Sequence, residues 1–423
     1  MKNMSNIHEK SIQICTTFDE MIARWEHVGL YSSYMAKKGA MTDLELLKKI
    51  ELFFNDLEAL KTELFVKRGS FTRNTEAGIG IYTAPKNLYA PTQYAKKWFP
   101  YAFLFEPLSF RSLINEYVVL EVSSRFRYFY EFYSYNLLEI NIVNDQVTVS
   151  TAKQDCTEVF KFKTAKQMLL GITDISSLDT FYIELLNNMV KDYKELIKLG
   201  RKHKNLDSAF NKKRNDYISY VKELLDEYGS LRVFSMNFYL DKSSQFFDHA
   251  QVKSQFFNKI RFINDLNIIV GYFGSWEYSH LDGFFFRVVF FVPKNKIQDI
   301  RSLIDSMIYH WEVQSDVSKD KELSKIKFTA EPCPISFSNK SLKDIQCVLV
   351  SDKTKLFDDF VNSVINYTTL ADKYFFPAEL QIFIFEHMAK EKKKKNEKNQ
   401  YLVESMQYSF SRSFKGQTRN RKN

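Results

Sequence analysis

The stretch YFGSWEYSHLDGFFFRVVFFV, residues 272–292, places two strand-like apolar runs on either side of a short polar break. Asp282-Gly283 within that break is a dipeptide typical of a turn between antiparallel strands. The pattern predicts strands over 268–278 and 284–292. Pro293 follows, and it ends the second strand because proline has no backbone N–H to give to a sheet. The stretch therefore predicts a pair of antiparallel strands.

The segments on both sides of this pair extend the pattern. A helix is predicted over 217–228, a strand over 231–240 and a helix over 251–264. After the pair, residues 297–311 carry apolar side chains at helical spacing. The order strand, helix, strand, strand, helix predicts an α+β domain, in which an antiparallel sheet has helices on one face.

The first half of the chain predicts a separate, mixed α/β domain of unknown role. Residues 43–66 and 179–199 have the spacing of amphipathic helices. Residues 138–143 and 146–150 alternate around Asn144-Asp145, which indicates a hairpin. Residues 200–215 are rich in Lys, Arg and Asn and are interpreted as a linker. We therefore expect an N-terminal domain over 1–205 and a second domain over 206–388.

Composition excludes several classes of protein. The four cysteines are far apart and form no CxxC pair, so neither a disulfide framework nor a cysteine zinc site is expected. No apolar run approaches the roughly 18 residues that span a bilayer. Residues 1–24 lack the apolar core of a signal peptide. The sequence predicts a soluble, cytoplasmic protein without a membrane partner.

The positive charge is concentrated at the C-terminus. Residues 389–423 contain 11 Lys or Arg against 3 acids, a net charge of +8, while the whole chain carries +9. Such a segment can neutralise nucleic-acid phosphates, and it can equally be a solvated tail. We expect a basic, disordered tail. Its candidate nucleic-acid contacts are Lys392, Lys393, Lys394, Lys395, Arg412, Lys415 and Arg419.

Five ordered segments between residues 220 and 417 resemble the YagK/YfjJ C-terminal domain family, a group of inovirus-type prophage replication proteins. The segments are YVKELLDEYGSLRVFSMNFYL (220–240), YFGSWEYSHLDGFFFRVVFFV (272–292), MIYHWEV (307–313), INYTTLADKYFFP (365–377) and SRSFKGQ (411–417). Each segment is weak by itself, and the resemblance rests on their order and spacing. It covers less than half of the chain and implies the antiparallel sheet of a rolling-circle replication initiator (Rep).

The resemblance implies a specific chemistry. Active members of the family carry His-x-His after the glycine that corresponds to Gly283, and the two imidazoles on one strand face bind a divalent cation. A tyrosine, matched by Tyr367 or Tyr374, then attacks the phosphate and holds the DNA end covalently.

This sequence departs from that pattern at three motifs. Phe285 and Arg287 stand at the histidine positions, and Asn237 stands where the family has an acid. Leu370 replaces a lysine three residues after Tyr367. Whether the protein is an enzyme is left open by the resemblance, but these changes favour a protein without endonuclease activity.

Two of the motif residues have competing interpretations. Arg287 could replace the metal as a phosphate clamp, because guanidinium pairs with phosphate in a bidentate way. The simpler interpretation is drift, with Arg287 paired to Glu277 or exposed on the surface. Glu277 matches the family's acid near the metal, but without the histidines the favoured interpretation is a paired or solvated strand carboxylate.

The leading hypothesis is a replication-initiator-like phage, prophage or plasmid protein that binds single-stranded or origin-type DNA without cofactor and no longer nicks it. One alternative is an active tyrosine nickase that uses Mg or Mn. Another is a non-catalytic protein-interaction module. The sequence leaves the oligomeric state, the host element and the recognised DNA sequence open. RFRYFYEFYSY, residues 125–135, could be a platform for stacked bases, although core packing is the simpler interpretation.

Overall fold

The protein was analysed as a computed structural model, and its described residues form two compact units. One unit comprises Met1–Ser11, Glu45–Glu116 and Ser123–Asn205, and the other comprises Ile12–Leu44, Tyr117–Val122 and Leu206–Asn423. Described residues are 2–27, 40–60, 63–67, 89–98, 125, 128, 139–143, 146–150, 160–162, 180–199, 201–241, 246–279, 282–297, 299–313, 327–374 and 413–416. The division differs from the sequence-based one because residues 12–44 group with the second unit.

The first unit is built from helices and two small sheets. Its strands β1 and β2 pair antiparallel, and β3, β4 and β5 form a three-stranded antiparallel sheet. The hairpin expected around residues 144–145 is confirmed in its strands, since Val143 lies opposite Gln146, while the two turn residues lie outside the described part. The elements are α3 (Ala40–Ala59), β1 (Phe65–Lys67), β2 (Tyr89–Pro91), α4 (Gln93–Trp98), β3 (Glu139–Val143), β4 (Gln146–Ser150), β5 (Phe160–Phe162) and α8 (Thr180–Leu199).

Two residues of the aromatic stretch 125–135 are described, and both pack inward. Arg125 is buried and forms ion pairs with the carboxylates of Glu51 and Glu58. The Tyr128 hydroxyl donates to the carbonyl of Met189, and its ring packs against Tyr193. An arginine held by two carboxylates has little freedom to contact a phosphate backbone. These two positions therefore support core packing over a stacking platform.

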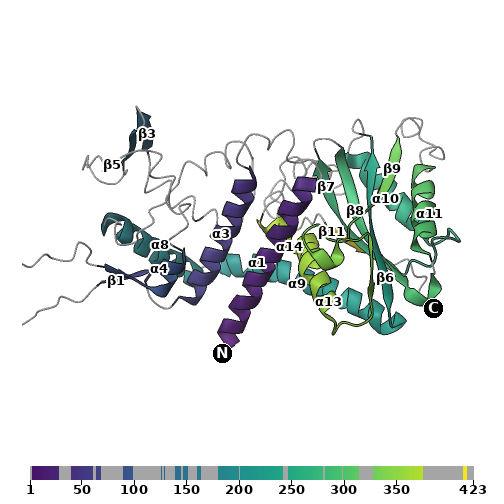
Figure 1. The fold of residues 1–423 in the computed structure, drawn as a ribbon, viewed down its shortest axis with the longest axis horizontal. Coiled ribbons are helices and arrows are strands. Elements are labelled where there is room, and N and C mark those ends of the chain that lie inside the picture. The colour runs from purple at the N-terminus through teal and green to yellow at the C-terminus, as the bar shows by residue number, and fades with distance from the viewer. Residues whose placement is uncertain are drawn as a thin grey trace, which may run out of the picture. The chain divides into compact units, whose positions relative to one another are not determined.

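The second unit contains a six-stranded antiparallel sheet, which confirms the expected α+β class. The order is β10-β6-β8-β7-β11, and β9 also pairs with β6 beyond the end of β10 (Figure 1). The expected central pair is present, with Ser279 opposite Gly283 at its closed end. Gly283 has φ 74°, a left-handed conformation that glycine adopts without strain. The strands are β6 (Leu231–Leu240), β7 (Gly271–Ser279), β8 (Gly283–Pro293), β9 (Phe328–Cys333), β10 (Gln346–Leu349) and β11 (Ser413–Gly416).

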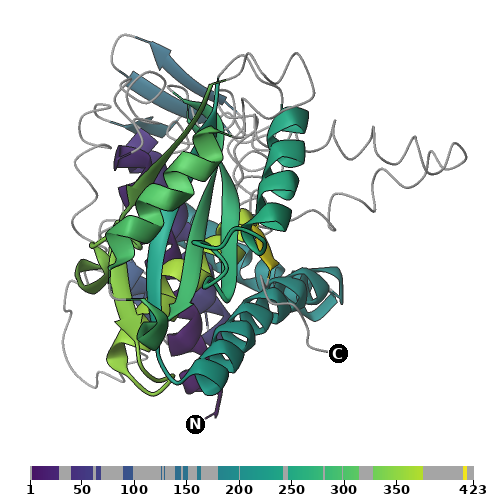
Figure 2. The same cartoon turned by 90° about the vertical axis from the view of Figure 1, so that its right-hand side faces the viewer.

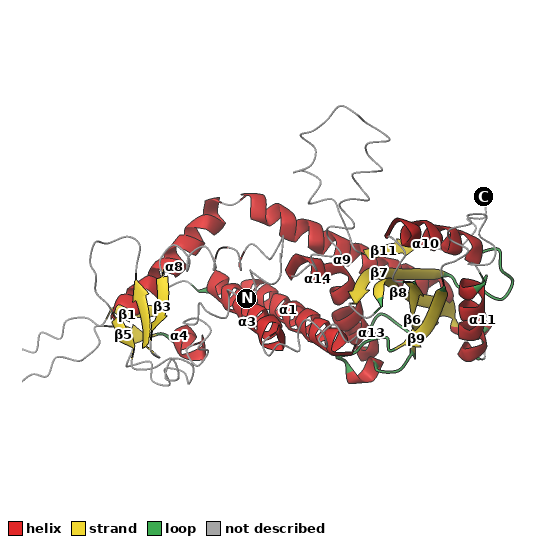
Figure 3. Ribbon diagram, turned by 90° about the horizontal axis from the view of Figure 1, so that it is seen from above, coloured by secondary structure: helices red, strands yellow, loops and turns green. Residues whose placement is uncertain are grey.

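Helices cover both faces of this sheet, where the sequence led us to expect one. Alternate residues of β8 point to opposite faces. Phe286, Val288 and Phe290 pack with α10 (Phe246–Ile260) and α11 (Ile300–Glu312), the layer in front of the sheet in Figure 2. Val289 and Phe291 pack with α9 (Arg201–Tyr228) and α13 (Lys355–Phe360) on the other side. Figure 3 shows these two helices beside the sheet, with α11 on its opposite side. Burial on both faces explains why β8 is apolar almost throughout.

The expected linker is wrong, because residues 201–215 form the first half of α9. Lysine and arginine favour helix, and the segment is attached to α14 (Asn366–Tyr374). Nε of Arg214 donates to Oδ1 of Asn366 over 2.6 Å, and Nζ of Lys213 lies 3.9 Å from Asp372. A helix that is polar on most sides was mistaken for a connecting segment.

Part of the basic C-terminal segment is a strand. β11 pairs antiparallel with β7, and Phe414 lies opposite Gly274. A Cβ at Gly274 would overlap the Arg287 carbonyl oxygen of β8 and lie 2.9 Å from the Phe414 ring, so this glycine permits the close approach of both neighbouring strands. The Tyr220 hydroxyl donates to the carbonyl of Gly416 over 2.7 Å. Residues 413–416 thus depart from the expected disorder, and the other tail positions lie outside the described residues.

Candidate functional site

The positions that resemble the initiator motifs meet on one face of the central sheet. Register places Asn237 opposite Arg287 on β6 and β8, and Glu277 opposite Phe285 on β7 and β8. Directly opposed residues of antiparallel strands project to the same face. We call the face that carries these four residues and Ser275 the site face. The resemblance implied this grouping, and the register of the sheet produces it.

Neither residue at the histidine positions lies free on the surface. Phe285 is 2 % exposed, and its ring centroid is 4.9 Å from that of Tyr239. Arg287 is 5 % exposed and donates to the carbonyl oxygens of Pro334 and Ile335. The interpretation of Arg287 as an exposed surface residue is therefore wrong.

One aromatic ring and one neighbouring positive charge affect the Arg287 guanidinium. It lies 4.6 Å from the centroid of the Phe337 ring, a cation–π contact. Burial, and next the positive charge of Arg24, lower the pKa of Arg287 from its ordinary value. Arginine nevertheless remains protonated in proteins. Its Nε is buried and has no hydrogen-bond partner among the residues that the structure describes.

Asn237 and Gly283 have structural surroundings. The Asn237 amide donates to the Tyr239 hydroxyl over 2.9 Å, and its Oδ1 accepts from the Cys333 thiol over 3.3 Å. The Tyr239 hydroxyl in turn donates to Glu331. An amide serves here as donor and acceptor at once, which a carboxylate cannot do. Gly283 opens β8 at the turn and carries no side chain toward the site face.

Tyr367 is the candidate nucleophile that reaches the site face. It is the second residue of α14, which continues directly from a π-helical turn, η6 (Val361–Ile365). The side chain is 1 % exposed. Its hydroxyl donates to Oε2 of Glu277 over 2.8 Å, and the Ser275 hydroxyl donates to Oε1 over 2.7 Å.

Tyr374, the second candidate, lies two helical turns further along α14. It is 3 % exposed, and its ring centroid lies 5.2 Å from that of Phe18. The structure therefore brings Tyr367, rather than Tyr374, to the acid that the resemblance singles out.

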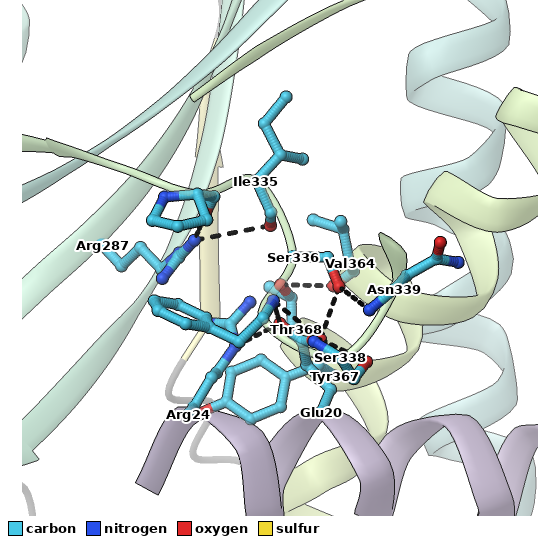
Figure 4. A network of polar contacts seen from close by, with 12 residues as sticks. Glu20, Arg24, Arg287, Ile335, Ser336, Ser338, Asn339, Val364, Tyr367 and Thr368 are labelled. Atoms are coloured by element: carbon cyan, nitrogen blue, oxygen red, sulfur yellow. Dashed lines mark hydrogen bonds and ion pairs between the residues drawn. The ribbon is translucent and has the colours of Figure 1, made fainter. Parts of the chain in front are cut away.

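The N-terminal helix α1 (Lys2–His27) supplies two site residues that sequence reasoning missed. Arg24 is 3 % exposed and stacks on the Tyr367 ring, with 3.7 Å between Cζ and the ring centroid (Figure 4). Its Nη1 lies 3.6 Å from Oε1 of Glu277, and its Nε donates to Glu20 over 2.7 Å. Burial by itself would lower the pKa of Arg24, but Glu20, Tyr367 and Glu277 outweigh it and raise that pKa.

Glu20 lies one turn before Arg24 and is held by the loop of residues 336–338. The hydroxyls of Ser336 and Ser338 donate to Oε2 over 2.6 and 2.7 Å. The backbone N–H groups of Phe337 and Ser338 donate to the same carboxylate, each over 3.0 Å. Burial would raise the pKa of Glu20, but the charge of Arg24, the hydroxyls of Ser336 and Ser338 and the N–H of Phe337 outweigh it and lower that pKa overall. The carboxylate is therefore charged, although it is fully buried.

No sequence signal distinguished Glu20 and Arg24 from an ordinary pair on a helix surface. Residues four apart on a helix often carry opposite charges and form exposed ion pairs. The apolar neighbours Phe18 and Met21 indicate a buried face, but they do not say which side of the helix carries the ion pair. Only the packing of α1 against the sheet and α14 shows that the pair is buried.

The donor set on the site face does not fit the divalent cation that the resemblance implies. Phe285 has no ligand atom, and Arg287 is a cation itself. Both oxygens of Glu277 already accept hydrogen bonds, and Arg24 places a positive charge beside them. Within the described ranges there is no group of three or more His, Cys, Asp or Glu that could hold a metal ion. The arrangement can bind charge by ion pairs, but it lacks the ligands for a metal.

The basic tail contributes one described cation. Nζ of Lys415 bonds the carbonyl of Asp216 and lies 5.3 and 5.4 Å from the rings of Tyr217 and Tyr220. The other candidate nucleic-acid contacts of the tail, namely Lys392, Lys393, Lys394, Lys395, Arg412 and Arg419, lie outside the described residues.

Comparison with known proteins yields no relative: no family model, no curated protein and no solved structure matches the chain. In the described part of the chain, none of the helices has the length and apolar character required to cross a membrane.

Proposed function

We propose that the protein is a DNA-binding protein of the rolling-circle initiator type, of prophage or plasmid origin, whose nicking centre no longer cleaves. Its ligand is single-stranded or origin-type DNA, and it acts in the cytoplasm where such DNA is replicated. The observation that carries the proposal is the buried contact between Tyr367 and Glu277 on the site face, with Arg24 stacked over the tyrosine.

The initiator part of the proposal is supported by an arrangement that sequence order alone does not require. Residues 277 and 367 are 90 positions apart, yet the tyrosine hydroxyl meets the acid of the second strand over 2.8 Å. The two residues at the histidine positions project to the same face. A tyrosine, an acid and the i, i+2 pair are the parts that an initiator centre needs in one place.

The loss of cleavage is supported by the chemistry of the same residues. Attack on a phosphodiester needs positive charge on the non-bridging oxygens as the transition state forms. Phe285 has no group that could supply this positive charge. Arg287 has one, but its guanidinium donates to the carbonyls of Pro334 and Ile335. The Tyr367 ring is covered by Arg24, so DNA has no path to the hydroxyl in this conformation.

DNA binding is supported by charge. The last 35 residues carry a net +8, and β11 anchors part of that segment to the edge of the sheet. The described cation of this segment, Lys415, is exposed beside α9 at the edge of the sheet, where we place a bound strand.

The proposal is tested by measuring binding and cleavage with the same DNA. Fluorescence anisotropy of single-stranded and duplex oligonucleotides, over a salt series that begins at about 50 mM, reports phosphate contacts. Supercoiled DNA incubated with Mg or Mn then reports nicking on a gel. We expect salt-dependent binding without nicked product. Absence of binding at the lowest salt would remove the initiator interpretation and favour a protein-interaction module.

One observation favours the active-nickase alternative. The Tyr367–Glu277 hydrogen bond is the contact by which a carboxylate could accept the proton of an attacking tyrosine. This enzyme would need α1 to move away and Mg or Mn to be held by ligands beyond the site face. A covalent protein–DNA adduct that is lost in Tyr367→Phe and kept in Tyr374→Phe would establish it.

A further inference from the structure

The 336–338 loop gathers four hydrogen-bond donors around one point. Two are backbone N–H groups, of Phe337 and Ser338, and two are hydroxyls, of Ser336 and Ser338. All four donate to a single carboxylate, and Figure 4 shows them converging on Glu20. Successive backbone N–H groups that point into one concavity form an anion-binding nest. Because all four donors belong to the loop itself, the loop can bind an anion other than Glu20.

The cations beside the loop extend this site. Arg24 and Arg287 lie on the same aromatic ring, with their Cζ atoms 5.6 and 4.6 Å from the centroid of Phe337. Two guanidinium groups next to a nest of N–H and O–H donors are the usual partners of a phosphate group. Of the two, Arg287 belongs to strand β8, so its position does not change when α1 moves.

Arg287 also carries a donor that is unused. Its Nε is buried and finds no hydrogen-bond partner within the described part of the chain. A buried polar group without a partner is destabilising, so its retention calls for an explanation. An additional acceptor at this site would satisfy it.

We propose that the 336–338 loop and Arg287 form a binding site for a phosphate group, which Glu20 occupies in the closed conformation as an intramolecular substitute. The carboxylate imitates two oxygens of a phosphate, and a phosphate offers further acceptor oxygens to Arg287. The site opens when residues 12–27 of α1 leave the site face. Because the same helix covers Tyr367, occupation of the loop by phosphate and exposure of the tyrosine are coupled.

The ligand class rests on the donors alone, whereas DNA as the source of the phosphate rests on the proposed function. Inorganic phosphate and a DNA backbone present the same oxygens, so both are tested separately. Inorganic phosphate and a short oligothymidylate serve as probes, at constant ionic strength set by chloride.

The first test uses variants of the full-length protein. Glu20→Ala removes the carboxylate that occupies the loop and takes away one negative charge. Phosphate should therefore bind to this variant at least about tenfold more tightly than to wild type. Ser338→Ala in addition removes a hydroxyl donor and should reverse most of that gain. Asp19→Asn, an exposed acid on the same helix, is the matched control and should leave the affinity unchanged. Isothermal titration calorimetry gives all four affinities.

Equal phosphate affinity of Glu20→Ala and wild type would overturn the proposal, and so would a gain that Ser338→Ala leaves intact. Phosphate binding without oligothymidylate binding supports the site and removes DNA as its ligand. Binding of both supports the site and the proposed function together.

A second measurement needs no variant and covers the case in which Glu20→Ala does not fold. Hydrogen–deuterium exchange of the wild-type protein is followed with and without phosphate. If phosphate displaces Glu20, deuterium uptake rises over residues 12–24, while the amides of residues 337 and 338 stay protected because they then donate to phosphate instead of Glu20. Unchanged uptake over residues 12–24, or increased uptake at residues 337 and 338, would contradict the proposal.

Discussion

The hydroxyl of Tyr367 donates a 2.8 Å hydrogen bond to Oε2 of Glu277, and both side chains are buried on the site face. The contact links the only candidate nucleophile that reaches this face to the acid that the initiator resemblance identified. The same hydrogen bond occupies Oε2 of Glu277, an oxygen that would otherwise be available to a metal ion.

Divalent metal should not bind tightly at the site face. Phe285 and Arg287 offer no ligand, and Glu277 is committed to Ser275, Tyr367 and Arg24. Titration calorimetry with Mn or Zn should show no stoichiometric heat. A stoichiometric site that persists without the tail and disappears in Glu277→Gln would contradict this expectation.

Cleavage of DNA should be absent for single-stranded and supercoiled substrates alike. Without a metal or paired imidazoles the charge that develops on the phosphate is poorly stabilised. The readout is a protein–DNA adduct on a denaturing gel. Wild type and Tyr367→Phe should be indistinguishable, with Tyr374→Phe as the matched tyrosine control.

Non-specific DNA affinity should reside mostly in the basic tail. Each phosphate contact adds roughly −0.9 to the slope of log affinity against log salt on duplex DNA. Deletion of residues 389–423 should flatten that slope by several units, but it also removes β11. The sharper variant changes Lys392, Lys393, Lys394 and Lys395 to Gln and keeps the strand. An unchanged slope in this variant would show that these lysines are only solvated.

Arg24 should be essential for stability. Arg24→Ala leaves the buried carboxylates of Glu20 and Glu277 without their shared cation, and breaking a buried pair in this way costs about 3–5 kcal/mol. Urea denaturation should show this loss, whereas Arg301→Ala, an exposed arginine on α11, should change the free energy of unfolding by less than about 0.5 kcal/mol. A small effect at Arg24 would mean that α1 is not held at the site face.

Acid should weaken the fold through Glu20. Its pKa in the folded protein lies below the ordinary 4.5, so below that value the unfolded chain binds the proton more readily than the folded chain. The stabilisation by Glu20 is therefore complete above about pH 4.5 and is lost as the pH falls through the lowered folded pKa. Unfolding of wild type and Glu20→Gln between pH 3 and 6 should show a smaller loss in the variant.

Much of the sheet could be predicted from local pattern. The strand over 231–240 agrees with β6 at both ends, and the pair around Gly283 agrees with β7 and β8 to within a few residues. These predictions succeed because turn residues and apolar runs act locally. The linker over 200–215 was wrong because a helix that is polar on most sides has no such signal. Its contacts with Asn366 and Asp372 of α14 are tertiary and cannot be seen in local sequence.

The shared face of Phe285 and Arg287 could also be predicted, since the i, i+2 alternation of one strand determines it. That Glu277 joins them was implied by the resemblance and depends on the register of β7 with β8. The sequence could not tell that Arg287 is buried, because the carbonyls that bind it come from residues 334 and 335 on a distant part of the chain. It likewise could not choose between Tyr367 and Tyr374.

The sequence by itself determined the antiparallel pair at Asp282-Gly283, the absence of histidine at positions 285 and 287 and the basic charge of the last 35 residues. These are properties of neighbouring residues or of composition. Tertiary structure alone decided that helices cover both faces of the sheet and that β11 joins its edge. It also decided that Arg24 of α1, paired with Glu20, covers the ring of Tyr367 beside Glu277. The physical reason is that a charge can be buried only where other groups donate to it or pair with it. The loop residues that donate to Glu20 lie more than 300 positions away along the chain.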